Sequence, residues 1–143
     1  MKSLIAVVAG IIVGGVVVFA VEALGSSLLY ALTGIEPITA QGAAELASVR
    51  PTESLLVVVF AYVLGPMAGG YIAARLAPFK RYFHAIAVGA VQLIFGVITL
   101  ALFPHPEWFW IATLAVFIPA AMAGAGLARH GHRRHRHTHQ SPT

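Results

Sequence analysis

Charged residues and cysteine are scarce in this sequence. Only 10% of the 143 residues are charged, and neither aspartate nor cysteine occurs. The lack of cysteine excludes disulfides and thiolate metal sites. A soluble domain carries charge on roughly a quarter of its residues, whereas this chain is 59% hydrophobic and has a mean hydropathy of +0.85. The composition therefore indicates a membrane protein.

Motifs typical of enzymes and of nucleic-acid-binding proteins are absent as well. The sequence has no HExxH motif, no phosphate-cradling loop and no nucleophile–base pair at a useful spacing. Its basic residues do not form a stripe with interleaved aromatic residues. We therefore expect no enzymatic activity, no cofactor and no nucleic-acid partner.

Four apolar segments follow one another, at residues 4–32, 54–76, 83–103 and 107–128. Each reaches the roughly 20 residues that a helix needs to cross a hydrocarbon core about 30 Å thick. The first exceeds the roughly 7–15 apolar residues of a signal peptide and is not closed by an Ala-x-Ala site, so we expect it to remain as a span. The predicted fold is all-α, a four-helix antiparallel transmembrane bundle over residues 1–128.

Basic residues indicate how these helices are oriented. Arg50 alone lies on the side of the first connection, and the other eight lie on the side of the two termini. These eight are Lys2, Arg75, Lys80, Arg81, Arg129, Arg133, Arg134 and Arg136. Because basic residues favour the cytoplasmic side of a membrane, both termini are predicted to be cytoplasmic.

Small residues recur at helical spacing and predict close helix packing. Gly65 and Gly69 form a GxxxG pair, and Gly10, Gly14 and Gly124 lie in similar small-residue stretches. The stretch PMAGGYIAAR is also similar to AAMAGAGLAR near the end of the last segment. This match indicates two duplicated helical hairpins, although a bias toward small residues would produce it as well.

One carboxylate, that of Glu22, lies within the first apolar segment. At about 1.5 Å per residue it lies about 27 Å from the start of the apolar core, in the outer half of the membrane. On a helical wheel it shares a face with glycines, so it is predicted to face other helices. Counting depth along the other segments predicts an outer-leaflet polar cluster of Glu22, Ser26, Thr99, Thr113 and His105.

Two roles are open for this cluster. In a structural role, Glu22 hydrogen-bonds to hydroxyl groups and holds the helices in register, since an unpartnered carboxylate near the membrane core costs a few kcal/mol. In a functional role, it is a proton or cation site. The shallow depth of Glu22 favours the structural role. Gln92, the other strongly polar residue deep in a span, differs from Glu22 by about 15 Å in depth and is not expected to contact it.

Residues 129–143 are rich in histidine and arginine. We expect a disordered cytoplasmic tail that is attracted to anionic lipid. Five histidines in it are weak candidates for binding a divalent metal ion, but neighbouring arginines repel a cation, so no metal site is expected. These histidines are His130, His132, His135, His137 and His139.

Three motifs carry a resemblance to known proteins: EALG at residues 22–25, AGGYIAAR at residues 68–75 and PHPEWFW at residues 104–110. On these motifs, residues 1–128 resemble a group of small bacterial four-helix membrane proteins with no assigned function. The resemblance implies four spans in a bacterial inner membrane and implies no activity. The plan of four helices with a glutamate in the first also resembles that of small multidrug transporters, without their sequence motifs.

The expected function is that of a structural or accessory subunit of the bacterial inner membrane. Glycine faces suit association with a second copy or with a larger membrane protein, and four short helices enclose little volume of their own. The alternative is a small proton- or cation-coupled transporter or channel that forms an oligomer and uses Glu22.

Overall fold

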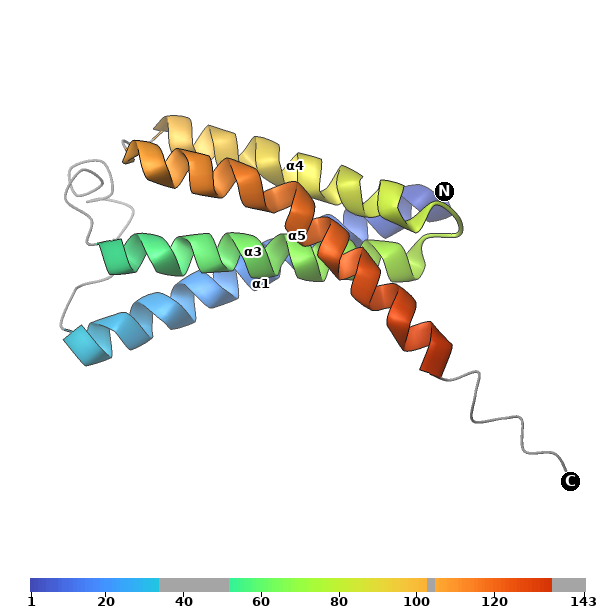
Figure 1. The fold of residues 1–143 in the computed structure, drawn as a ribbon, viewed down its shortest axis with the longest axis horizontal. Coiled ribbons are helices and arrows are strands. Elements are labelled where there is room, and N and C mark those ends of the chain that lie inside the picture. The colour runs from blue at the N-terminus through green and yellow to red at the C-terminus, as the bar shows by residue number, and fades with distance from the viewer. Residues whose placement is uncertain (34–51, 103–104, 135–143) are drawn as a thin grey trace, which may run out of the picture.

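The chain is described by a computed structural model over residues 1–33, 52–102 and 105–134, except for the side chains of Thr33, of Glu53 and of residues 130–134. This part of the chain is all-helical and contains four helices, α1 (Lys2–Thr33), α3 (Thr52–Leu76), α4 (Arg81–Leu102) and α5 (Glu107–Arg134) (Figure 1). All four are long and apolar enough to cross a membrane. The prediction of an all-α chain with four membrane-length helices is therefore confirmed.

A tight connection at residues 77–80 joins α3 to α4. Pro78 lies in it and cannot continue the helical hydrogen-bond ladder. The carbonyl of Lys80 accepts hydrogen bonds from the amides of Phe83 at 2.9 Å and His84 at 3.4 Å, so α4 begins there. Lys80 adopts a left-handed backbone conformation with a φ of 45°. The chain thereby reverses within four residues, and α3 and α4 become neighbours.

The last helix, α5, is longer than the sequence predicts. The sequence places its end at residue 128, because the apolar run stops there, and assigns residues 129–134 to a disordered tail. That assignment is wrong for these six residues, since α5 continues to Arg134. Helical hydrogen bonds do not require apolar side chains, and basic side chains near the C-terminal end of a helix interact favourably with its dipole. Residues 135–143 lie outside the described part.

Helix α3 is the centre of the fold. It contacts α1, α4 and α5, whereas α1 and α5 do not contact each other within the described residues. In Figure 1 the blue start of α1, the yellow-green start of α4 and the end of α3 lie at one end of the molecule, and the red end of α5 points away from them on the same side. At the other end of the molecule, the light-blue end of α1 lies away from the end of α4. Helices α1 and α4 therefore diverge along their length.

Small residues make the closest helix contacts. An ideal Cβ on Gly10 of α1 would lie 2.7 Å from the carbonyl oxygen of Gly69 on α3. On the other side of α3, a Cβ on Gly124 of α5 would collide with the carbonyl group of Met67. Backbones therefore pack directly against each other, as is typical where small residues line a membrane helix interface.

Larger apolar side chains close the end of the molecule opposite the N-terminus. Leu55 of α3, Leu100 of α4 and Phe109 of α5 form one buried cluster, and each is no more than 2% exposed. The N-terminal end is packed by alanines from the same three helices, among them Ala74, Ala85 and Ala125. Both ends of the α3–α4–α5 unit are therefore tightly packed, and α1 joins it mainly through α3, with a smaller contact to α4.

Helix α5 bends near its middle (Figure 1). Pro119 lies within this helix, lacks an amide hydrogen and displaces the carbonyl group one turn earlier, which is a common cause of a bend. Just beyond it, the backbone of Ala121 leaves no room for a Cβ on Gly70 of α3. The bend thus accompanies the close approach of α5 to α3.

Candidate functional site

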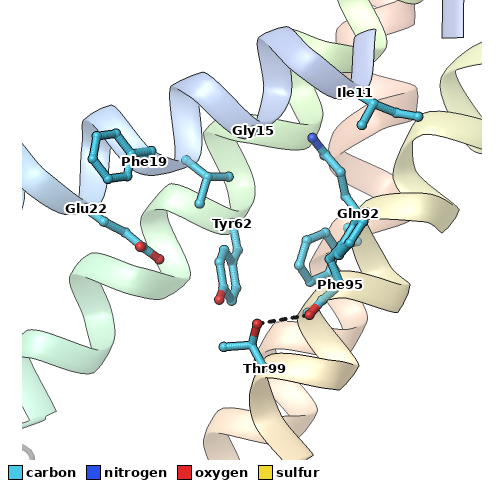
Figure 2. A pocket seen from close by; sticks show the side chains of 11 residues that line it. Ile11, Gly15, Phe19, Glu22, Tyr62, Gln92, Phe95 and Thr99 are labelled. Carbon is cyan, nitrogen blue, oxygen red and sulfur yellow. Dashed lines mark hydrogen bonds between the residues drawn. The ribbon is translucent and has the colours of Figure 1, made fainter. Parts of the chain in front are cut away.

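A cavity of about 430 Å³ lies between α1 and α4 (Figure 2). One side chain from α3 and one from α5 also line it. Most of its lining residues are apolar. The four that carry polar groups are Glu22, Tyr62, Gln92 and Thr99.

Helical periodicity explains why α1 and α4 line the cavity. Ile11, Gly15 and Glu22 on α1 are separated by four and seven residues, which places them on one face of the helix. Gln92 and Thr99 on α4 are separated by seven residues and likewise share a face. Because the two helices diverge, these two faces enclose a space rather than packing together.

The carboxylate of Glu22 lies toward the end of this space that is farther from the N-terminus (Figure 2). The side chain is half-buried, and Figure 2 shows its carboxylate and the hydroxyl groups of Tyr62 and Thr99 directed into the same region. The ring of Tyr62 is buried and packs on the ring of Phe117, with centroids 5.2 Å apart. This contact fixes the position of the Tyr62 hydroxyl. Three oxygen-bearing groups from three helices therefore face one site that suits a proton or a polar ligand group.

Gln92 lies toward the other end of the cavity and has unused hydrogen-bonding capacity. Its side chain is 7% exposed, and neither its amide oxygen nor its amide nitrogen has a hydrogen-bond partner. Gly14 of α1 makes room for it, because a Cβ there would collide with the amide nitrogen of Gln92. A buried polar group left unpaired costs about 1–3 kcal/mol. Hydrogen bonding to a molecule bound in the cavity would remove this cost.

The cavity brings together two of the five residues of the predicted polar cluster, Glu22 and Thr99. Ser26, Thr113 and His105 do not line it. The grouping expected from depth along the helices is therefore only partly assembled at this site.

The remaining three residues have other surroundings. Thr113 is fully buried, and its hydroxyl has no hydrogen-bond partner. The ring of His105 stacks on that of Phe109, with centroids 4.9 Å apart and an interplanar angle of 14°. Ser26 is half-buried, one turn beyond Glu22 on α1.

Two lining residues, Tyr62 and Gln92, were missed as partners of Glu22 by the reasoning from sequence. Counting residues along each helix gives only the depth of a side chain in the membrane. It predicted that Gln92 and Glu22 lie too far apart to contact each other, and it could not show that one cavity extends between their two depths. The available sequence signal for Tyr62 was its polar hydroxyl group within an apolar segment.

The five glycines predicted to mediate packing lie at helix contacts. Gly10 faces Gly69, and a Cβ on Gly14 would lie 2.9 Å from the carbonyl oxygen of Gly65. Gly124 packs on α3, as described above. The sequence pattern thus identified positions where backbones approach closely.

Basic residues gather where α3 and α5 end and α4 begins. The guanidinium of Arg75 lies 5.7 Å from the ring centroid of Tyr71, and that of Arg129 lies 5.7 Å from that of Tyr82. A cation above an aromatic ring is held by the negative face of that ring. This end of the molecule is therefore its positively charged end.

The tail histidines cannot be placed, because the side chains of His130 and His132 and all of residues 135–143 lie outside the described part. Within the described residues, no group of three or more histidine or glutamate side chains is arranged to hold a metal ion.

No protein-family model, no curated protein and no solved structure matches the chain. Fold and cavity define its class, which is a chain of four membrane-length helices with a mostly apolar cavity, lined also by four polar side chains, between two of them.

Proposed function

We propose that the four helices cross a bacterial inner membrane as an antiparallel bundle with both termini in the cytoplasm. Arg75 and Arg81 support this orientation, because they lie at the end of α3 and the start of α4, which Figure 1 shows near the N-terminus. Arg129 supports it as well, because it lies over the ring of Tyr82 near the start of α4. Basic residues at one end favour a cytoplasmic position for that end. They also support contact with anionic lipid, which is worth about 1 kcal/mol for each basic residue near the surface.

The proposal includes a duplication of two helical hairpins. In the first hairpin Gly10 of α1 packs on Gly69 of α3. In the second, a Cβ on Gly89 of α4 would lie 3.0 Å from the Cβ of Ala121 on α5. Ala121 lies one turn before Gly124, which aligns with Gly69 when Met122 is matched with Met67. The two hairpins thus use similar glycine contacts, displaced by about one turn.

Within the membrane, the proposed role is that of a structural or accessory subunit. The observation that carries it is the exposure of α1. In the most apolar 18-residue stretch of α1 only 17% is buried, compared with 39% in the corresponding stretch of α5. Side chains such as Ile12 and Val16 are left uncovered on a helix that packs mainly on α3. A helix from a second copy or from a larger membrane protein can pack on this face.

Site-specific photocrosslinking in native membranes tests the subunit role. A photoreactive amino acid at Ile12 is expected to give one crosslinked product of defined mass, and that mass distinguishes a second copy from a larger partner. Ile111 on α5 is the matched control, because it is an isoleucine that is also largely exposed. Crosslinking from both positions at equal yield, or from neither, would contradict the proposal.

Proton- or cation-coupled transport is the second candidate function. The cavity favours it, because it places Glu22 beside Tyr62 and Thr99 at membrane depth. Ionisable residues within membrane helices commonly mark ion or substrate pathways. A transporter would use the carboxylate to exchange a proton for a cation.

Flux measurements in proteoliposomes test this second candidate. Transport predicts that an added cation dissipates an imposed pH gradient, and that Glu22→Gln abolishes this flux without lowering the unfolding temperature. Glu107→Gln, at the exposed start of α5, is the control and should retain the flux. Undiminished flux in Glu22→Gln would remove Glu22 from the pathway, and no flux in the parent protein would reject transport.

A further inference from the structure

We propose that the cavity between α1 and α4 binds a neutral, lipid-soluble molecule that carries a hydroxyl or amide group and enters from the bilayer. This inference requires neither the subunit role nor transport, because it concerns binding at Gln92 and not proton exchange at Glu22 in the same cavity. It rests on the access to the cavity, on the unpaired amide of Gln92 and on the apolar walls.

The cavity is reached from the flank of the molecule. Gly15, Phe19, Phe95 and Thr99 line it and are exposed residues of α1 and α4. A Cβ placed on Gly15 would meet no atom within 4 Å, so the wall is open at this position. Both helices are membrane-length, so this flank faces hydrocarbon when the helices span a bilayer. A ligand that enters here comes from the lipid phase.

Gln92 selects the polar group of the ligand. Its amide nitrogen needs an acceptor and its amide oxygen needs a donor, and both are unpaired. Both amide atoms are buried in the structure, so the proposed binding requires rotation of this cavity-lining side chain to turn its amide toward the bound molecule. A hydroxyl or an amide group both donates and accepts, whereas an ammonium only donates and a carboxylate only accepts. The unpaired amide therefore favours a neutral head group over either ion.

The remaining walls suit a hydrocarbon portion. Ile11, Val18, Phe19, Phe95 and Phe117 supply most of the apolar lining. A volume of about 430 Å³ lies in the range of small-molecule sites, which are mostly apolar with a few convergent polar groups. The geometry thus combines apolar walls with a hydrogen-bonding position at Gln92, apart from the oxygen-bearing groups of Glu22, Tyr62 and Thr99.

Photoaffinity labelling in phosphatidylcholine nanodiscs tests the proposal. The probe is a dodecanol with a mid-chain diazirine, and two matched probes carry an ammonium or no polar group. Peptide mass spectrometry locates the label. The alcohol probe is expected to label cavity residues of α1 and α4, in competition with unlabelled dodecanol. The other two probes are expected to label these residues more weakly.

Two variants separate specific binding from partition into lipid. Gln92→Leu keeps a side chain of similar size and should weaken labelling about five-fold, the change expected when one hydrogen bond is lost. Gly15→Leu fills the open wall and should block labelling while leaving the unfolding temperature unchanged. Equal labelling by all three probes, stronger labelling by the ammonium probe, or undiminished labelling of both variants would overturn the proposal.

Discussion

Gly10 of α1 and Gly69 of α3 bring two helix backbones into direct contact. An ideal Cβ on Gly10 would lie 2.7 Å from the Gly69 carbonyl oxygen, and one on Gly69 would lie 2.5 Å from the Gly10 carbonyl oxygen. The contact is reciprocal, so neither position has room for a side chain. Because lipid provides little hydrophobic drive for helix association, packing of this kind determines how α1 is held.

Replacing Gly69 by valine should destabilise the protein. The side chain would force α1 away from α3, and overpacking of this kind costs roughly 1–3 kcal/mol. Gly15→Val is the matched control, because it makes the same change on an open face of α1. Reversible unfolding in mixed micelles measures both variants. Equal stability of the two variants would show that the α1–α3 contact is not the close one described.

Removing the hydroxyl of Thr113 should not destabilise the protein. Thr113 is fully buried and its hydroxyl is unpaired, so Thr113→Val is expected to raise the free energy of unfolding by about 1 kcal/mol. Thr99→Val is the control, since the Thr99 hydroxyl donates to the Phe95 carbonyl at 3.0 Å on an exposed face. Little change is expected there. A clear loss of stability in Thr113→Val would mean that its hydroxyl has a partner.

Truncation of Phe109 should loosen the end of the bundle opposite the N-terminus. This side chain is 1% exposed and packs with Leu55 and Leu100, so Phe109→Ala leaves a cavity and is expected to cost about 3 kcal/mol. Trp108→Ala, on the adjacent and exposed residue, should cost much less. Unfolding in mixed micelles compares the two. A similar cost for both would argue that lipid fills the space left by Phe109.

The absence of cysteine permits a direct test of orientation. Lys80 and Glu107 are both exposed. Lys80 directly precedes α4 and Glu107 begins α5, and Figure 1 shows the starts of these two helices at opposite ends of the molecule. In intact cells, a membrane-impermeant maleimide should label Glu107→Cys, and it should label Lys80→Cys only after permeabilisation. The reverse pattern would invert the proposed topology. Labelling of both variants in intact cells would indicate dual insertion.

Helix number was predictable from the sequence because apolar length alone decides whether a helix can cross a membrane. The same criterion failed at the end of α5, where the apolar run stops near residue 128 but the helix continues to Arg134. Backbone hydrogen bonding extends a helix beyond the bilayer without any apolar signal. Glycine positions such as Gly65 and Gly124 were also predictable, since small residues at helical spacing mark close backbone contacts.

The candidate site was only partly predictable. Glu22 and Thr99, which depth counting grouped, both line the cavity, and Tyr62 and Gln92 line it with them only in the folded chain. Which residues line a cavity depends on depth, and also on how each helix is rotated about its axis and how far the helices lie apart. Thr113 has a suitable depth, yet it faces the buried interior of the bundle and not the cavity.

By itself, the sequence determined that this chain is all-helical, that four segments are long and apolar enough to cross a membrane, and which small residues permit close approach. These properties follow from composition and periodicity along one helix at a time. The tertiary structure decided that α1 packs on α3 and diverges from α4, and that an unpaired Gln92 shares a cavity with Glu22. Such relationships depend on lateral packing between helices, where sub-ångström differences in side-chain fit select among arrangements that have the same hydropathy.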